Sequence, residues 1–296
     1  MSKRRILIQL DTDPQASVFD AVVAIDAGAE RLLQYSNIKP DQVRDLVHGA
    51  MYTRGPQDLK NTAVFVGGSN VVHGEQVFRN AIDAMFDPFK VSVMIDCNGS
   101  NSTAAAAVIS ASKHVALEGS TALVLGATGP VGLRVAKILA NEKSTVYLSS
   151  RSLERSQECV DQLVAQGLPP GRLIAISSGD QTWTDKAIRE CQMVFACGAA
   201  GIRLMSVDQL RQAKSLQVAV DLNAVPPLGI DGIGLTDKAT QREGRFDYGA
   251  LGVGGLKMKI HKASVASLFE SNTKVIDCQE MMAIGRDILA REAIAS

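Results

Sequence analysis

A glycine-rich turn lies near the middle of the chain, in the stretch TALVLGATGPVGLRVAKIL, where Gly126, Gly129 and Gly132 follow the spacing G-x-x-G-x-x-G. A run typical of a β-strand precedes the first glycine, and a helical pattern follows the last. Glycines at such a turn let backbone amides approach a pyrophosphate, and the helix N-terminus adds partial positive charge. The pattern favours a dinucleotide site over an ordinary tight turn. The residues predicted to contact the nucleotide here are Gly126, Thr128, Gly129, Pro130 and Val131.

The strand that follows this helix ends in TVYLSSRSLERS. In an NAD site an Asp or Glu near this position binds the ribose 2′-hydroxyl. Here the strand ends at Ser150 and Arg151, with Arg155 one helical turn later. Hydroxyl and guanidinium donors suit a 2′-phosphate. The sequence therefore predicts NADP, with NAD as the alternative cofactor and a solvated helix start as the non-functional interpretation.

Two later strand ends, FACGAAG and DLNAVPPLG, come where a dinucleotide fold receives the nicotinamide. Small residues allow the ring to lie close to the backbone, and the Pro-Pro pair stiffens the loop. Gly198, Ala199 and Asn223 are therefore predicted to contact the cofactor. Ordinary turns are the alternative interpretation.

Polar groups gather in two loops of the first hundred residues, DTDPQASVFD and DCNGSNST. Asp11 and Asp13 form a D-x-D pair, which is interpreted as a strand-end turn rather than a metal site, because no other ligand cluster accompanies it. Asp20 falls within the first predicted helix. The second loop offers donors and acceptors suited to a heteroaromatic, amide-rich ligand, and Ser102 or Thr103 is expected to cap the helix that follows. The polar residues singled out in this loop are Asn98, Ser100, Asn101 and Thr103.

Strand patterns alternate with helical patterns along most of the chain, which predicts an α/β protein with parallel sheets. The predicted strands are 6–10, 62–68, 91–96, 121–127, 145–150, 172–177, 193–198 and 217–223. We expect two lobes. One is a Rossmann-type NADP domain at 103–261, and the other is a smaller α/β substrate domain at 1–102, completed by the C-terminal segment 262–296.

Composition narrows the classes of molecule that the protein is expected to bind. The 31 basic and 31 acidic residues balance, so there is no excess charge to neutralise nucleic acid. The five cysteines and four histidines are scattered and form no zinc motif, which favours reduced thiols in the cytoplasm and no metal. The N-terminal apolar run is too short for a signal peptide, and no apolar run is long enough to span a membrane.

Several stretches together resemble one enzyme family: LDTDPQASVFD, YTRG, TAVFVGG, DCNGSNSTAAA, GATGPVG, VPPLGIDGI and GALGVGGLKMKIHKA. They are similar to those of the bacterial NADP-dependent methylene-tetrahydromethanopterin dehydrogenases, some of which also act on methylene-tetrahydrofolate. The resemblance implies hydride transfer from the methylene bridge of the reduced pterin to NADP⁺, giving the methenyl pterin. It also implies two α/β domains with the substrate between them, and a homotrimer. The chain departs from the family in GSNST, where GSNTT is typical, and in SSR, where Gly-Arg is common.

The same resemblance assigns residues to the site. It makes Lys257 the main active-site residue, positioning the substrate either as a nearly neutral amine or by a hydrogen bond at some distance from the reacting carbon. A solvated basic helix start is the alternative. His261 lies one helical turn further on and is predicted to bind the substrate with Asp20 and the polar loop, and Gly252 to contact the cofactor. The glycine run lacks the spacing of a phosphate loop.

This chemistry needs no general base, because a nitrogen lone pair stabilises the cation that remains when the methylene carbon loses hydride. The protein must instead bring the donor carbon and the nicotinamide together and exclude water. Two other interpretations stay open from the sequence. One is an NADP-dependent dehydrogenase of the methylene-tetrahydrofolate or shikimate type, and the other is a non-enzymatic NADP(H) sensor.

Overall fold

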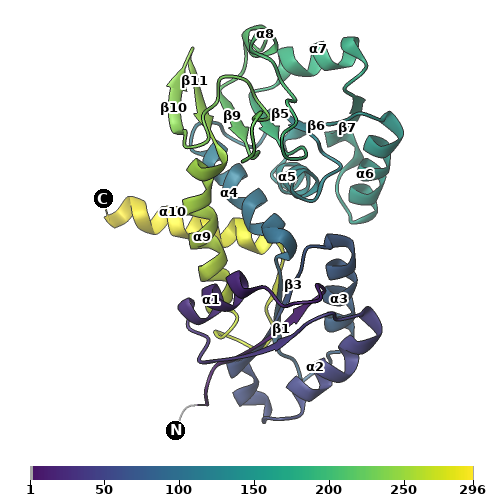
Figure 1. Cartoon of the computed structure of the whole chain (residues 1–296), viewed down its shortest axis with the longest axis vertical. Coiled ribbons are helices and arrows are strands. Elements are labelled where there is room, and N and C mark those ends of the chain that lie inside the picture. Colours follow the sequence, from purple (N-terminus) through teal and green to yellow (C-terminus); the bar gives the residue numbers. More distant parts are fainter. Residues whose placement is uncertain (1–2, 296) are drawn as a thin grey trace. The chain divides into compact units, whose positions relative to one another are not determined.

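The structure, a computed structural model, describes residues 3–295 and divides into two compact units, each with its own sheet (Figure 1). Unit 1 comprises the chain up to Ser102 and again from Met258, and unit 2 comprises Thr103–Lys257. The two boundaries fall within helices α4 (Ser100–Ser112) and α9 (Ala250–Ser267).

Unit 1 is built on a five-stranded sheet of order β12-β4-β3-β1-β2, in which every pair is parallel. Its elements are β1 (Ile6–Asp11), α1 (Val18–Asp26), β2 (Arg31–Tyr35), α2 (Val43–Met51), β3 (Thr62–Gly67), α3 (Val71–Asp83), β4 (Ser92–Ile95), β12 (Val275–Ile276) and α10 (Cys278–Ala295).

The two faces of this sheet differ in chemistry because strand side chains alternate. One face carries Ile8, Leu10, Val64 and Val66, which are buried under apolar residues of α2 and α3. The alternate positions of the central strands include Gln9 and Asp11 on β1, both fully buried. The second face therefore combines buried polar groups with apolar residues such as Leu7 and Phe65.

Unit 2 has a seven-stranded sheet of order β10-β11-β9-β8-β5-β6-β7. Read from β7 inward, the parallel strands follow the order 3-2-1-4-5-6 of a Rossmann fold, and β10 adds an antiparallel edge. The strands are β5 (Thr121–Leu125), β6 (Thr145–Ser150), β7 (Leu173–Ser177), β8 (Met193–Ala196), β9 (Val218–Asp221), β10 (Lys238–Arg242) and β11 (Arg245–Tyr248). The helices are α5 (Pro130–Asn141), α6 (Leu153–Ala165), α7 (Gln181–Glu190) and α8 (Val207–Gln212), of which α7 and α8 contribute to the core over β5, β6 and β8.

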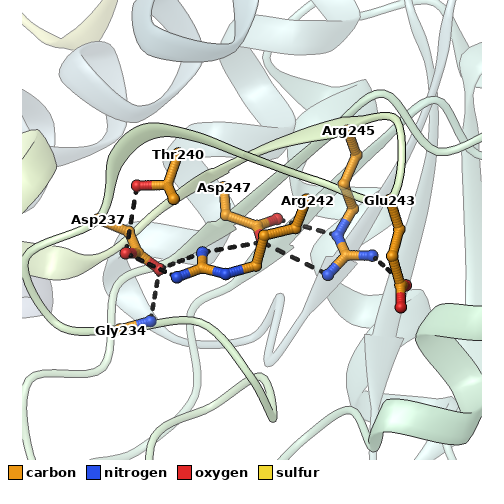
Figure 2. Close-up of polar contacts among 7 residues, drawn as sticks. All are labelled: Gly234, Asp237, Thr240, Arg242, Glu243, Arg245 and Asp247. Carbon is orange, nitrogen blue, oxygen red and sulfur yellow. Dashed lines mark hydrogen bonds and ion pairs between the residues drawn. The ribbon is translucent and has the colours of Figure 1, made fainter.

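An ionic network holds the β10–β11 hairpin at the edge of this sheet (Figure 2). Asp247 is fully buried and accepts from Arg245 Nε at 2.9 Å and from Arg242 Nη1 at 3.2 Å. Arg242 also donates from both terminal nitrogens to Asp237, at 2.6 and 3.1 Å. Each buried carboxylate thus has an arginine partner, which offsets the cost of removing the charge from water.

The loop before this hairpin supports the start of α9. The backbone N–H of Gly249 donates to the carbonyl of Asp237 at 2.9 Å, and that of Leu251 to Leu235 at 3.0 Å. A methyl group on Gly252 would lie 1.8 Å from the Asp237 carbonyl oxygen, and one on Gly249 would lie 2.1 Å from that of Gly234. Close packing therefore explains why these two positions of the run GALGVGG are glycine. The run is helical from Ala250 on.

Each strand predicted from the sequence is present, with ends within a few residues of those expected. Strands β2, β10, β11 and β12 were not predicted. Strand β2 lies at the edge of its sheet with mostly exposed side chains, so it lacks a buried apolar pattern. Strand β12 has two residues.

Two general properties complete the fold. Within residues 3–295 no helix is long and apolar enough to cross a lipid bilayer. The five cysteines are buried, and within the described residues they are thiols rather than disulfides.

Candidate functional site

The glycine turn of unit 2 is shaped by contacts that exclude a side chain. Gly126 has φ +71°, and a methyl group there would lie 2.7 Å from the Cα of Gly198. A methyl on Gly132 would lie 2.7 Å from the carbonyl oxygen of Gly126 and 2.8 Å from the Cα of Ala127. The first glycine therefore serves a left-handed turn, and the third allows helix and strand to pack closely.

Helix α5 starts directly after this turn. Gly129 occupies its N-cap position and Pro130 its first turn, and no side chain caps the helix within the described residues. Backbone amides at an uncapped N-terminus can bind a phosphate, because they carry unsatisfied donors and partial positive charge. Val131 is the second residue of this helix.

A cavity of about 540 Å³ opens beside the turn. Of the residues predicted to contact the nucleotide, it brings together Gly126, Thr128, Gly129, Pro130, Ser150, Arg151, Arg155, Gly198 and Ala199. None of the cavity-lining residues in the described part of the chain carries a carboxylate. The cavity is therefore suited to an anionic ligand.

The end of β6 provides the cationic part of this cavity. Ser150 is buried, whereas Arg151 and Arg155 are exposed at the start of α6. Ser152 caps this helix by accepting from the backbone N–H of Arg155 at 3.3 Å. Because Ser152 caps the helix, neither arginine side chain is needed for capping, and both guanidinium groups can turn toward a phosphate.

Asn223 lies after β9 and is not one of the residues that line the cavity. Its side chain instead connects the neighbouring loops by hydrogen bonds to their backbone. Its Oδ1 accepts from the backbone N–H of Val225 at 3.0 Å and from that of Gly201 at 3.4 Å. Its Nδ2 donates to the carbonyl of Pro227 at 3.3 Å. Burial raises the pKa of Asp221, although this carboxylate accepts from the backbone amides of Asn223 and Ile230. Asn223 therefore fixes the loops that border the predicted nicotinamide position.

The polar site of unit 1 centres on Asp96, directly after β4. One carboxylate oxygen, Oδ1, accepts from the backbone N–H of Asn101 at 2.9 Å and of Ser102 at 3.1 Å. These bonds satisfy amides in the first turn of α4. The expectation that Ser102 or Thr103 caps this helix was wrong, because α4 begins at Ser100 and both residues lie within it. The hydroxyl of Ser102 instead donates to Asp96 Oδ2 at 2.6 Å. A carboxylate five residues upstream reaches the amides because Asn98 turns the chain with φ +52°.

The same Asp96 binds His261 of α9, whose Nδ1 lies 2.7 Å from Oδ2. Both side chains are buried, and the imidazole packs edge-on against Phe65 with ring centroids 5.9 Å apart. Burial by itself raises the pKa of Asp96, but the hydrogen bond and charge of His261, with the bonds from Ser102, outweigh it. They hold the pKa of this carboxyl below its ordinary value of 3.8.

Two further carboxylates converge at the end of β3. A methyl group on Gly67 would lie 3.5 Å from Asp11 Oδ2 and 3.5 Å from Asp20 Oδ2. Burial raises the pKa of Asp20; the charge of His261 opposes this shift, and the charges of Asp96 and Asp11 reinforce it. Asp20 therefore belongs to the same electrostatic cluster as the Asp96–His261 pair.

Asp11 and Asp13 have the role of a strand-end turn. Asp11 accepts from the backbone amides of Asp13 and Ser17, each at 2.9 Å. Asp13 in turn accepts from the backbone and hydroxyl of Ser69 at 2.9 and 2.8 Å. Residues 3–295 contain no group of three or more His, Cys, Asp or Glu side chains placed to hold a metal ion.

The predicted substrate residues of the DCNGSNST loop divide by exposure. Ser100 and Asn101 are buried, and their side chains donate to the backbone carbonyls of Cys97 and Ile95, each at 2.7 Å. These bonds shape the loop. Asn98 is exposed and Thr103 partly so, which leaves these two side chains accessible.

Lys257 is half-buried on α9, one helical turn before His261. Lys259 is exposed and forms an ion pair with Glu292 at 2.5 Å. The helical spacing expected for Lys257 and His261 is therefore present, and Lys259 is engaged elsewhere. Gly252 lies earlier on the same helix, where its packing contact accounts for the glycine, and its predicted contact with the cofactor stays a prediction.

Sequence reasoning did not single out Asp96 or Gln9, which belong to this polar cluster. Gln9 donates to Asp11 Oδ2 at 3.2 Å and accepts from Gln34 at 3.1 Å. A signal was available, because Gln9 and Asp11 alternate with Ile8 and Leu10 in a strand that is otherwise apolar. Two polar residues at the same parity in a central strand indicate a polar face.

The fold and the glycine turn define the class: an α/β protein of two parallel-sheet units, one of them a Rossmann domain, like the NAD(P)-binding dehydrogenases. Shikimate 5-dehydrogenase from Listeria monocytogenes, solved in complex with shikimate and NAD, shares this fold with a TM-score of 0.54 at 13% identity, over 95% of this chain and 96% of that one.

Sequence comparison identifies the family. Residues 18–98 match the family model described as methylene-tetrahydromethanopterin dehydrogenase, N-terminal. The "Bifunctional protein MdtA" of Methylorubrum extorquens is 41% identical over 97% of this chain and the full length of that protein. The "NAD(P)-dependent methylenetetrahydromethanopterin dehydrogenase" of the same organism is 31% identical over 86% of this chain and 88% of that one. The chain belongs to the methylene-tetrahydromethanopterin dehydrogenase family.

Proposed function

We propose that this protein is an NADP-dependent methylene-tetrahydromethanopterin dehydrogenase of one-carbon metabolism, and that it also accepts methylene-tetrahydrofolate. The methylene carbon of the pterin loses a hydride and becomes the methenyl cation, and NADP⁺ accepts that hydride. Membership of the family supports the reaction. The observation that supports binding of NADP is the cavity at the glycine turn of unit 2, whose lining residues carry no carboxylate.

The choice of NADP over NAD rests on the end of β6. Ser150, Arg151 and Arg155 line the cavity at the place where an acidic residue would bind the 2′-hydroxyl in an NAD site. A 2′-phosphate there can form charge-assisted hydrogen bonds with either guanidinium. The amides at the start of α5 suit the pyrophosphate. The fixed loops around Asn223 border the place proposed for the nicotinamide.

The proposed pterin groups belong to the polar cluster of unit 1 and to the accessible side chains near it. The carboxylate of Asp20 suits the amide-type N–H donors of a pterin ring, and Asn98 and Thr103 supply accessible polar groups. No residue needs to remove a proton from the reacting carbon. The role proposed for these side chains is orientation and exclusion of water.

Lys257 is proposed to position the pterin by a hydrogen bond rather than to lie beside the reacting carbon. A full positive charge 4 Å from the developing cation would raise the barrier by about 4 kcal/mol at an effective dielectric constant of 20. A donor that contacts the pterin away from this carbon avoids most of that cost.

Replacement of Lys257 by alanine tests this function. We expect kcat/KM for methylene-tetrahydromethanopterin to fall about 10- to 100-fold, the value of one charge-assisted hydrogen bond. Lys259→Ala is the matched control, because it removes an exposed lysine from the same helix and should leave kcat/KM nearly unchanged. Equal kinetics for wild type and Lys257→Ala would exclude the assignment.

The choice of substrate distinguishes the other interpretations. Methylene-tetrahydromethanopterin, methylene-tetrahydrofolate and shikimate are compared in the wild type with NADP⁺ and with NAD⁺. Turnover of shikimate alone would replace the proposal with a shikimate-type dehydrogenase, and tight NADP binding without any turnover would replace it with a nucleotide sensor. The homotrimer that the resemblance implies stays a prediction, which light scattering of the purified protein tests.

A further inference from the structure

The side chain of Asp96 forms hydrogen bonds with two helices, α4 and α9, through residues that belong to unit 1. Its Oδ1 binds two backbone amides of α4, and its Oδ2 binds the hydroxyl of Ser102 and the Nδ1 of His261 on α9. The carboxylate is almost fully buried. Four hydrogen bonds, from three residues, account for the acceptor capacity of this buried carboxylate.

We propose that Asp96 is a positioning residue of the pterin site, one that fixes the first turn of α4 and holds His261 in the tautomer with a proton on Nδ1. This inference rests on the proposed function and adds a residue to it. An ionised carboxylate can accept hydrogen bonds but cannot donate them. The imidazole nitrogen that faces it must therefore be the donor. The other ring nitrogen, Nε2, is then the acceptor whenever His261 is neutral.

The surroundings of the imidazole restrict it further. Phe65 of β3 packs against one side of the ring, and the nearby carboxylates of Asp20 and Asp96 act on it electrostatically from α1 and from the end of β4. The side chain is 3% exposed, so water cannot readily replace the bond to Asp96. Asp96 therefore determines both the orientation of this ring and the place of its proton.

Asp96→Asn separates the two tasks of the carboxylate. The two amides of α4 require an acceptor, so the amide oxygen of the new side chain should turn to them and its NH₂ group should face His261. Nδ1 must then accept, which moves the ring proton to Nε2. The cap of α4 is retained while the tautomer is inverted, a change that a purely structural role would not require.

The test combines kinetics with nitrogen NMR of the full-length protein. In Asp96→Asn we expect kcat/KM for the pterin to fall about 10- to 100-fold, as for other residues that orient a site from behind it. We expect KM for NADP⁺ to change less than about twofold, because Asp96 lies in unit 1. Ser112→Ala is the control: it removes a hydroxyl of the same helix that donates to the carbonyl of Ile109 rather than to Asp96, and it should change kcat/KM by less than about threefold.

A double-mutant cycle shows whether Asp96 acts through the histidine. Asp96→Asn should add little to the loss already caused by His261→Ala. An equal loss in both backgrounds would overturn the proposal, and so would unchanged kcat/KM in Asp96→Asn.

One readout does not depend on turnover or on how well a variant folds. Long-range ¹H–¹⁵N spectra of the wild type should show the proton of neutral His261 on Nδ1, and a proton on Nε2 instead would overturn the proposal. If the wild type does not oxidise the methylene pterin, the proposed function fails, whereas these spectra still decide whether His261 carries its proton on Nδ1, the nitrogen that faces Asp96.

Discussion

The two units build their candidate sites from different materials. At its glycine turn, unit 2 uses the backbone: a side chain at Gly126 or Gly132 would meet backbone atoms at 2.7 Å, and amides at the start of α5 are the polar groups. Ser150, Arg151 and Arg155 add side-chain donors to the same cavity. Unit 1 uses buried side chains: Asp96 is hydrogen-bonded to His261 of α9, and Asp11 to the backbone before α1. All three side chains are almost inaccessible to water.

The ligands proposed for the two units would account for this difference. A nucleotide phosphate is the same in every reaction, so a rigid turn of main-chain donors is sufficient to bind it. A pterin presents several donors and acceptors in a fixed plane, and complementary side chains must be oriented by other side chains behind them. Substitutions in unit 2 should therefore act by obstruction or lost charge, and substitutions in unit 1 by altered orientation or protonation.

Gly132→Ala should have the largest effect on the nucleotide site. The new methyl group would lie 2.7 Å from a backbone oxygen and 2.8 Å from a backbone carbon, neither of which can move without shifting the turn. Overpacking of this kind costs about 3 kcal/mol, and if that cost falls on the binding conformation, affinity for NADP⁺ drops about 100-fold. Calorimetric titration with NADP⁺ measures it.

Gly171→Ala provides the matched control, because nothing lies within 4 Å of a methyl group at that position in the same unit. Its affinity for NADP⁺ should equal that of the wild type. Equal affinities for Gly132→Ala and Gly171→Ala would show that close packing does not limit the turn.

Alanine at Arg151 or Arg155 should have an intermediate effect, confined to the phosphorylated cofactor. Each guanidinium is proposed to form charge-assisted hydrogen bonds with the 2′-phosphate, so KM for NADP⁺ should rise about 10- to 100-fold. KM for NAD⁺, which lacks that phosphate, should stay within about twofold. Steady-state kinetics with both cofactors measures the ratio, and a parallel rise for both would place the arginines elsewhere on the nucleotide.

Asp20→Asn should have the smallest effect on kcat/KM, a decrease of about tenfold if one charged hydrogen bond to the pterin becomes neutral. The same substitution should increase the stability of the folded protein at neutral pH, although it decreases kcat/KM. Because burial raises the pKa of Asp20, the folded protein holds its proton to higher pH than the unfolded chain does, and stability falls as the pH rises from 3.8 through the folded pKa. The variant lacks this titration and should be the more stable protein at neutral pH.

Chemical denaturation at a series of pH values checks that result. Asp26→Asn is the control, since Asp26 is an exposed residue of the same helix in an ion pair with Lys262 at 2.8 Å. Surface pairs of this kind contribute little. A loss of stability in Asp20→Asn at neutral pH would show that its charge is favourable in the folded protein.

The residues that line the cavity of unit 2 could be grouped from the sequence because they are close together in the chain. The glycine turn, Ser150 and Arg151 are separated by one helix and one strand, and the Rossmann order brings their ends to one edge of the sheet. The glycines of the run before Lys257 were harder to interpret. A packing contact with the Asp237 carbonyl leaves no local pattern by which to recognise it.

Periodicity and short motifs were enough to predict the α/β class, the central strands, the glycine turn before α5 and, by resemblance, the family. The tertiary structure alone decided the partners of Asp96. That residue reaches the start of α4 only because Asn98 turns the chain, and it meets a histidine 165 positions later in the sequence. Hydrogen bonds between distant elements depend on how strands and helices pack, and packing follows from many weak contacts that no single stretch of sequence contains.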